Sequence, residues 1–165
     1  MTVEITRVDV ADLDLATATA LARIDNAALD GVPLRHHTAE TFLLDCRDRN
    51  GEGPDAGLWL AHHGPSLVGY AALTLNLFEN LDGAKILGAV HPDHQRQGVG
   101  RQLMTTAEAA TDRPRLRAPA WAGTPGQQAV PHFGYTRHGS HEVRRLGVRT
   151  PQRPDLVAAA EEATR

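Results

Sequence analysis

The chain has 165 residues, of which 41% are hydrophobic and 22% charged, proportions that are typical of one globular domain with its own core. Its one cysteine, Cys46, excludes an internal disulfide and a multi-cysteine zinc site. The sequence contains neither a leader-like segment nor an apolar stretch near 20 residues. We therefore expect a cytoplasmic protein that does not enter a membrane.

Charge is distributed unevenly along the chain, although the net charge is only −3. Residues 1–83 carry 13 acidic and 5 basic side chains, a net charge of −8, whereas residues 84–165 carry 7 acidic and 12 basic ones, a net charge of +5. The basic half suits a polyphosphate ligand, and the acidic half suits a cationic ligand through electrostatic steering. The acidic total and the lack of interleaved basic and aromatic residues argue against nucleic-acid binding.

The first half of the chain predicts one strand, two helices and a three-stranded meander. Alternating residues predict the first strand over residues 2–10. Asp12 or Asp14 can cap the first helix, and Thr38 can cap the second. Short apolar runs, the first two joined by a turn, predict the strands of the meander over residues 58–61, 67–75 and 84–90.

The second half predicts a helix over residues 99–111 and a strand over 116–121. Because that helix separates the strand from residues 84–90, we expect the two strands to be parallel. A short helix that Pro131 limits, closing strands over residues 137–148 and a small helix over 155–164 follow. We expect one α/β (α+β) domain over residues 1–150 and a tail or linker over 151–165.

The segment 86–104 is the most informative part of the sequence. An apolar run stops at His91, and a polar loop with two glycines leads into a helical pattern. The first N–H groups of a helix lack partners and lie at the positive end of its dipole, so they bind anions. Gly98 and Gly100 let a phosphate approach the backbone closely, and Arg96 and Arg101 add charge.

This segment resembles motif A of the GNAT superfamily of N-acetyltransferases. The family pattern Gln/Arg-x-x-Gly-x-Gly/Ala is met by Gln95, Gly98 and Gly100, and the preceding Val-x-Pro turn by residues 90–92. The spacing differs from that of a P-loop and from that of a dinucleotide fingerprint. The alternative is an ordinary strand–turn–helix connection in which the glycines serve close packing.

The order of the predicted elements is similar to that of the GNAT fold over residues 3–148. The resemblance implies a mixed central sheet with splayed parallel strands, flanked by helices. In closer detail the chain is similar to one half of the actinobacterial tandem GNAT proteins of the mycothiol acetyltransferase type. The cues are the strand at residues 58–61, the Glu79-Asn80 loop and residues 142–146.

The resemblance implies acetyl-CoA as co-substrate, without a metal. It assigns the pantetheine and the thioester carbonyl to the backbone of the motif strand, at Leu87, Gly88, Ala89 and Val90. It assigns the pyrophosphate to the loop and first helical turn, at Gln95, Arg96, Gln97, Gly98, Val99, Gly100 and Arg101. Gly88 fits a β-bulge, a close approach of the ligand, or simple tight packing.

The catalytic side chains are less well defined. The common family glutamate is replaced by Ala84, which leaves Glu79 and Asp82 as the nearest carboxylates, and Glu79 is the better candidate for a general base. The general acid is commonly a tyrosine four residues before a Gly-Phe pair. If Gly134 begins that pair, Val130 occupies the acid position; if Gly139 does, Tyr135 is the acid.

The resulting hypothesis is an N-acetyltransferase that transfers an acetyl group to a small, cationic amine directly in a ternary complex. The alternative is a non-catalytic acyl-CoA-binding module, either degenerate or half of a tandem protein. The expected assembly is a homodimer or a pair with a second GNAT half, and neither nucleic acid nor membrane is an expected partner.

Overall fold

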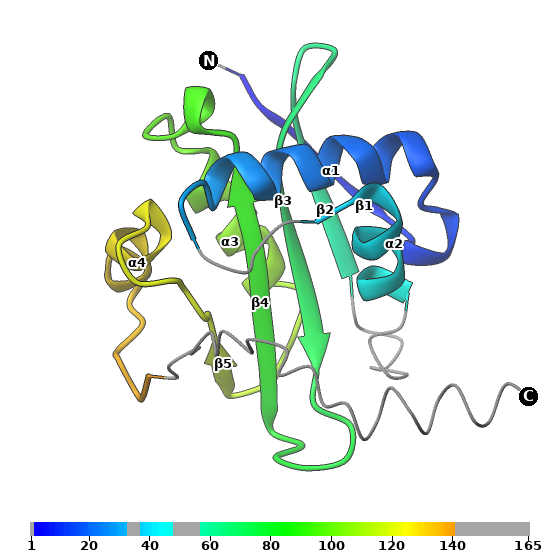
Figure 1. Cartoon of the computed structure of the whole chain (residues 1–165). Coiled ribbons are helices and arrows are strands. Elements are labelled where there is room, and N and C mark those ends of the chain that lie inside the picture. Colours follow the sequence, from blue (N-terminus) through cyan, green and yellow to red (C-terminus); the bar gives the residue numbers. More distant parts are fainter. Residues whose placement is uncertain (1, 33–36, 48–56, 141–165) are drawn as a thin grey trace, which may run out of the picture.

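A five-stranded mixed sheet forms the centre of the computed structural model, which describes residues 2–32, 37–47 and 57–140. The strands lie in the order β1–β2–β3–β4–β5 (Figure 1). The first four strands pair with one another in antiparallel orientation, and β5 is parallel to β4, as predicted. Their bounds are β1 (Glu4–Val8), β2 (Gly57–His63), β3 (Ser66–Leu75), β4 (Gly83–Val90) and β5 (Arg115–Arg117).

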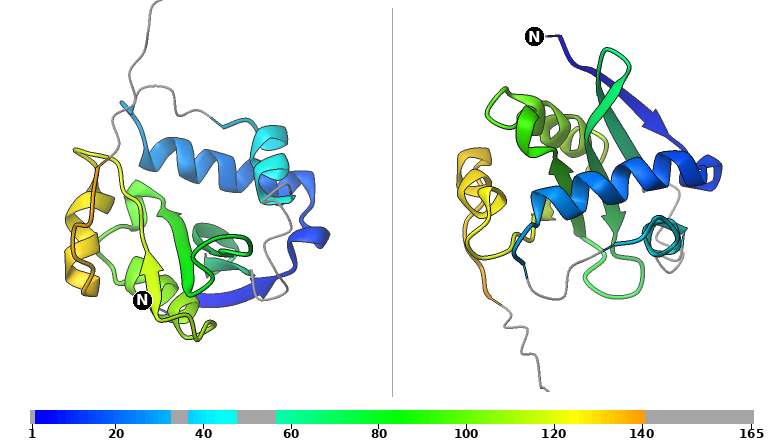
Figure 2. Two further views of the ribbon diagram at one scale, coloured as in Figure 1. Left: turned by 90° about the horizontal axis from the view of Figure 1, so that it is seen from below. Right: turned by 45° about the horizontal axis from the view of Figure 1, so that its top comes forward.

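Helices cover both faces of this sheet (Figure 2). Helices α1 (Leu15–Ala28) and α2 (Ala39–Arg47) lie on one face, and α3 (Val99–Glu108) lies on the other. Helix α4 (Pro125–Ala129) follows β5. Three short 3₁₀ turns complete the described elements: η1 (Val10–Asp12), η2 (Pro92–His94) and η3 (Val130–Phe133).

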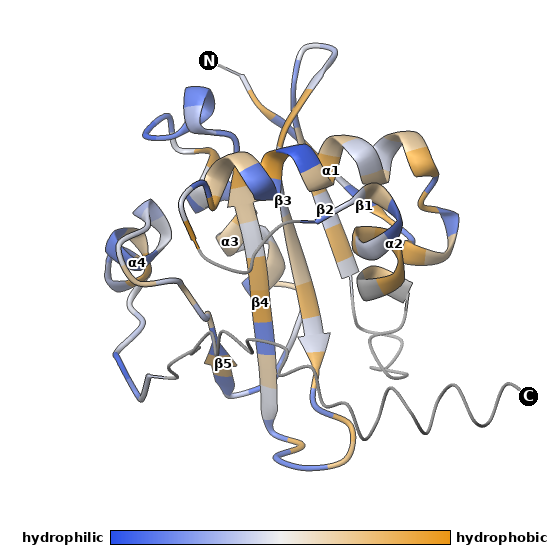
Figure 3. Cartoon of the chain, viewed as in Figure 1, coloured by the Kyte–Doolittle hydropathy of each residue, from blue (hydrophilic) through white to orange (hydrophobic). Residues whose placement is uncertain are grey.

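Alternation along the strands builds two separate cores. In β2, Leu58 and Leu60 join the apolar cluster under α1 and α2, whereas Trp59 and Ala61 join the cluster under α3. Since both faces are covered, the central strands are mostly apolar, and the polar residues lie mainly in the loops and on the helices (Figure 3). The described helices include none that is long and apolar enough to cross a bilayer.

Two helix starts agree with the caps predicted from the sequence. The Asp14 carboxylate accepts a 2.7 Å hydrogen bond from the backbone N–H of Thr17, and the Thr38 hydroxyl accepts one of 3.2 Å from that of Thr41. The helical spacing of Val99, Leu103, Met104 and Ala107 predicts one apolar stripe, and helix α3 buries all of these residues except Met104, which is partly buried. Local sequence signals thus set the start or the buried face of each long helix.

Several elements are shorter than the sequence predicts. β1 ends at Val8 because Asp9 caps a 3₁₀ turn, and β5 stops at Arg117, two residues before Pro119, which has no N–H to donate to the sheet. Helix α3 ends at Glu108, after which the chain continues in i→i−3 turns. Residues 137–140 have no regular structure, and the predicted elements over 141–148 and 155–164 lie outside the described residues.

Candidate functional site

The carboxyl-terminal part of β4 is open on the side that faces β5. On the other side β4 pairs with β3 along its length, from Ala84 to Val90. β5 pairs only with residues 83–85, at the start of β4. Figure 1 shows the two strands side by side only at that end. The backbone of residues 87–90 therefore borders a gap in the described sheet, and Gly88 there is exposed.

Gly88 is required for close packing of β4 against β3. A Cβ atom at this position would lie 2.5 Å from the carbonyl oxygen of Tyr70 and 3.2 Å from the Cα of Ala71. The β-bulge interpretation of Gly88 is wrong, because the register between β3 and β4 is continuous there. The irregularity lies instead between Ala61 and His62, in the pairing of β2 with β3.

The loop after β4 delivers unpaired amides to the start of α3. Gly98 is the N-cap, with a φ of +85° that favours glycine, and no side chain caps the helix. The first hydrogen bond of the helix runs from the N–H of Gln102 to the carbonyl of Gly98, at 3.1 Å. The N–H groups of Val99, Gly100 and Arg101 therefore have no acceptor within the helix, and they lie at its positive end.

Two glutamines hold this loop in shape. The side-chain amide of Gln95 donates a 3.0 Å hydrogen bond to the carbonyl oxygen of Val90, which ties the loop to the end of β4. The side-chain amide of Gln97 donates to the carbonyl of Asp93 at 3.1 Å. In the described geometry these two side chains organise the loop, so the backbone amides are the groups presented to an anion.

Two arginines connect the loop to the segment after β5. Arg96, a non-glycine residue with a φ of +59°, donates a 3.3 Å hydrogen bond to the side chain of Gln128 in α4. The guanidinium of Arg101 lies 5.8 Å from the ring centroid of Phe133 in η3. Both side chains are exposed and add positive charge beside the start of α3.

The two carboxylates before β4 differ in their surroundings. Glu79 is exposed in the loop between β3 and β4. Asp82 forms an ion pair with Arg115, whose hydrogen bond lowers the pKa of the Asp82 carboxyl. The N–H of Arg115 also donates to the carbonyl of Asp82, at 3.1 Å. Asp82 thus fastens the start of β4 to β5, and its lowered pKa makes it a poor proton acceptor.

Tyr135 is oriented toward the end of α3. Its hydroxyl donates a 2.8 Å hydrogen bond to the Glu108 carboxylate, and burial, followed by this hydrogen bond, raises the pKa of the phenol. Gly134, with a φ of +88°, ends η3, whereas in the described residues Gly139 follows no helix. This geometry agrees with the alignment in which Gly134 begins the Gly-Phe pair; the role of Tyr135 stays a prediction.

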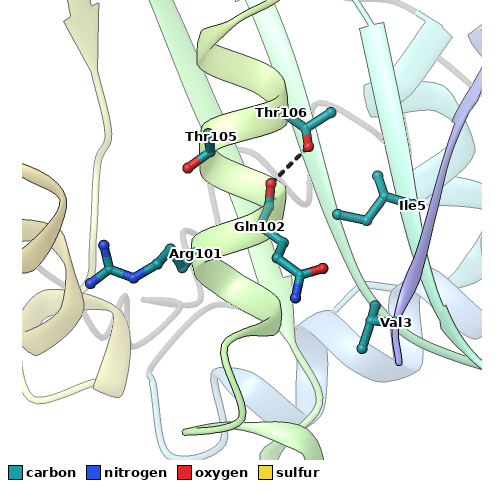
Figure 4. Close-up of a pocket in the computed structure, with 6 residues that line it drawn as sticks. All are labelled: Val3, Ile5, Arg101, Gln102, Thr105 and Thr106. Carbon is teal, nitrogen blue, oxygen red and sulfur yellow. Dashed lines mark hydrogen bonds between the residues drawn. The ribbon is translucent and has the colours of Figure 1, made fainter. Parts of the chain in front are cut away.

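A shallow surface depression lies on the other side of α3, against β1 (Figure 4). Of its lining residues, only Arg101 also lies within the segment 95–101 that starts α3, and its side chain points away from Ile5. The depression therefore does not coincide with the gap beside β4. The six lining residues are Val3, Ile5, Arg101, Gln102, Thr105 and Thr106.

A buried polar cluster on the α1 side was not found from the sequence. It joins Asp25 of α1, Tyr70 of β3 and His37, which precedes α2. The available signal was Asp25 itself, a charged residue four positions after Leu21 on the buried stripe of α1. Its partners follow only from the tertiary structure.

Sequence comparison identifies relatives of the chain. The acetyltransferase (GNAT) domain profile matches residues 54–139. The chain is 31% identical over 156 residues to a mycothiol acetyltransferase of Kineococcus radiotolerans, a match that covers 91% of this chain and 47% of that protein. The chain thus spans about half the length of this curated relative.

Solved structures share the fold at low sequence identity. An aminoglycoside acetyltransferase from an uncultured soil metagenomic sample, in complex with sisomicin, is 18% identical, with a TM-score of 0.62 over 87% of this chain and 96% of that one. Aminoglycoside N-acetyltransferase AAC(6')-Iy in complex with CoA is 13% identical, with a TM-score of 0.62 over 88% and 95%. The ribosomal-protein-alanine N-acetyltransferase of Brucella melitensis biovar Abortus is 20% identical, with a TM-score of 0.60 over 88% and 100%.

The names of these structural relatives refer to different acceptors, so the shared fold does not identify the acceptor of this chain. The profile match, the mixed sheet and the strand–loop–helix unit around Gly98 agree with one another. The chain belongs to the GNAT family of acetyltransferases.

Proposed function

We propose that the protein transfers the acetyl group of acetyl-CoA to a small, cationic amine, directly and in a ternary complex. The observation that carries the proposal is the uncapped start of α3 beside the open stretch of β4. The free N–H groups at the start of α3 suit a phosphate, and the open backbone of β4 suits an extended chain of amides. An acyl-CoA carries both a pyrophosphate and an extended chain of amides.

The proposed contacts with the co-substrate are mainly backbone contacts. The amides from Gln97 to Arg101 would hold the pyrophosphate, with added charge from Arg96 and Arg101. The exposed backbone around Gly88 would pair with pantetheine and donate to the thioester carbonyl. A donor at that carbonyl stabilises the oxyanion that forms when the amine attacks.

Two side chains stay candidates for proton transfer. Glu79 is an exposed carboxylate that can attract an ammonium group or take its proton through water. Tyr135 would have to turn from Glu108 to protonate the leaving thiolate, and its raised pKa keeps the phenol protonated near neutral pH. Holding the amine and the thioester close together supplies much of the rate even without either group.

The charge distribution supports a cationic acceptor, although part of the acidic charge has structural roles. The carboxylate of Asp9 caps η1, that of Asp14 caps α1, and Asp82 pairs with Arg115. Glu79 and other exposed carboxylates of the first 83 residues are left to attract a cation.

A second candidate function is acyl-CoA binding without catalysis. The observation that favours it is the replacement of both common catalytic side chains, by Ala84 and, in one alignment, by Val130. Its partner would be a second GNAT half, because the curated relative is about twice as long as the match. For the enzyme we propose one domain over residues 1–150, a cytoplasmic location, and assembly as a homodimer or with such a second half.

Calorimetric titration with acetyl-CoA, followed by a thiol-release assay with a panel of amines, separates the two candidates. The enzyme should bind acetyl-CoA and release thiol only when an amine is added. Binding without release on any amine would support the non-catalytic module, and failure to bind would contradict both.

A further inference from the structure

Asp25 is a charged side chain in the apolar interior between α1 and the sheet. It is 5% exposed, and both of its oxygens face polar groups. One accepts a 2.8 Å hydrogen bond from the Tyr70 hydroxyl, and the other lies 3.4 Å from Nε2 of His37. A buried carboxylate is costly unless such contacts compensate it, so this arrangement depends on all three residues.

The His37 ring is held in place by further contacts. The side chain of Asn26 accepts from the N–H of His37 and donates to its carbonyl, both at 2.7 Å. The ring of Phe42 packs edge-on against His37, at 5.9 Å, and against Tyr70, at 5.4 Å. The His37 side chain is nevertheless 13% exposed, so the imidazole is fixed without being sealed from solvent.

The cluster borders the open stretch of β4. Tyr70 lies directly opposite Ala89 in the pairing of β3 with β4, and both side chains belong to the core under α1. Helix α1 crosses in front of β3 and β4 (Figure 1), on the face opposite α3 (Figure 2). Tyr70 thus lies one strand away from the backbone that we assign to the thioester, and its hydroxyl joins that strand pair to Asp25 on the face that α1 and α2 cover.

Resting on the proposed acetyl transfer, we propose that His37 takes the proton from the acceptor amine. Asp25 positions the imidazole ring through its contact with Nε2, and Tyr70 fixes the Asp25 carboxylate. Ala84 cannot serve this purpose, because its methyl side chain accepts no proton and is fully buried in the core under α3. With His37 as the base, Glu79 is left to attract the cation.

The proton balance of the proposed step is complete. The ammonium group gives one proton to His37, and the lone pair of the resulting amine attacks the thioester carbon. The C–N bond forms, the C–S bond breaks, and its electron pair leaves on the sulfur. The second proton of the nitrogen goes to the thiolate, and His37 returns its proton to solvent.

The test compares His37→Gln, Asp25→Asn and the control His138→Gln, which changes an exposed histidine outside the cluster. Each variant is assayed with the most active amine of the panel and titrated with acetyl-CoA. His37→Gln should lower kcat by about 10²- to 10⁴-fold and change the pH profile of kcat/KM relative to that of the native protein. Asp25→Asn should give a smaller fall, and His138→Gln none. Acetyl-CoA affinity should stay unchanged in all three.

Chemical rescue separates catalysis from a structural role. If His37 is the base, added imidazole should restore part of the activity of His37→Ala. If the cluster serves only the stability of the fold, His37→Ala should lower the thermal stability, keep the native kcat and pH profile, and show no response to imidazole. That result would overturn the proposal. A native protein that binds acetyl-CoA but acetylates no amine would instead refute the proposed function and, with it, this role of His37.

Other groups near the His37 ring could also contribute to the pH profile, so their contribution has to be separated from that of His37. Among the described residues these are Asp25 from α1 and Tyr70 from β3, with Cys46 of α2 packed against the same apolar cluster. A native pH profile in Cys46→Ala, together with a changed profile in His37→Gln, would support His37 as the base. A changed profile in Cys46→Ala, with the native profile retained in His37→Gln, would overturn that role.

Discussion

Gly88 of β4 packs so closely against Tyr70 of β3 that no side chain fits between them. A Cβ atom at Gly88 would lie 2.5 Å from the Tyr70 carbonyl oxygen, well inside van der Waals contact. The neighbouring atoms belong to the backbone of β3, which cannot move aside as a side chain can. Gly88 therefore positions the strand that we assign to the thioester, and Tyr70 links that strand to the polar cluster under α1.

Gly88→Ala should destabilise the protein, because the added methyl group forces β4 away from β3. We expect the free energy of unfolding to fall by about 1–3 kcal/mol, as for other overpacked core positions. Urea denaturation measures this change, with Gly139→Ala as the matched control, since a Cβ at Gly139 meets nothing within 4 Å. Equal stability of the two variants would contradict the close packing at Gly88.

Tyr135→Phe should reduce the loss of stability at alkaline pH. The pKa of Tyr135 is higher in the folded chain than in the unfolded chain, where it is about 10. The stabilisation from its retained proton is complete below about pH 10 and is lost as the pH rises toward the folded-state pKa. Unfolding free energies at about pH 8 and about pH 11 should therefore differ less in the variant than in the native protein. The same difference in both would argue against the raised pKa.

The same variant also tests Tyr135 as the general acid. If the phenol protonates the leaving thiolate, kcat should fall by about 10²- to 10⁴-fold while the affinity for acetyl-CoA is retained. An unchanged kcat would assign the Tyr135–Glu108 hydrogen bond to packing alone.

Glu79→Gln should raise the KM for a cationic amine and leave kcat and its pH profile unchanged. The reason is that the exposed carboxylate attracts the ammonium group, whereas His37 takes the proton. Steady-state kinetics across the neutral range measure both parameters. A fall of kcat/KM by about 10- to 100-fold with an altered pH profile would make Glu79 the base and contradict the role of His37.

The preference for a cationic acceptor should be sensitive to salt. If the acidic first half of the chain steers the amine, kcat/KM should fall as the Debye length shrinks from about 10 Å at 0.1 M to about 3 Å at 1 M. The measurement uses a panel of polyamines, aminoglycosides and lysine-like amines beside neutral and anionic acceptors. If neutral or anionic acceptors outcompete every cation, the charge distribution does not determine the acceptor, and the prediction is wrong.

The strand–loop–helix unit around Gly98 could be predicted from the sequence because its signals are local. The apolar run, the glycine spacing and the stripe of α3 all lie within about twenty consecutive residues. The caps at Asp14 and Thr38 are local as well. Each of these signals joins residues that lie only a few positions apart in the sequence.

The remaining site contacts join distant parts of the chain, and periodicity does not encode them. Tyr70 contacts Asp25 across 45 positions, and Arg96 contacts Gln128 across 32. The length of β5 depends on where Asp82 holds Arg115 and on Pro119 beyond it. The bulge interpretation of Gly88 was wrong because glycine alone does not distinguish a bulge from a close approach of two backbones.

The most direct test of the central claim is the affinity of Gly100→Glu for acetyl-CoA, measured by calorimetry. A Cβ at Gly100 meets only the side chain of Val90, at 3.8 Å, so the fold should tolerate the change, and Gly139→Glu serves as the control. Because the new carboxylate lies at the amides that we assign to the pyrophosphate, Gly100→Glu should lose acetyl-CoA binding while its thermal stability is retained, and Gly139→Glu should bind normally. Native affinity in Gly100→Glu would contradict the assignment of the start of α3 as the coenzyme A site.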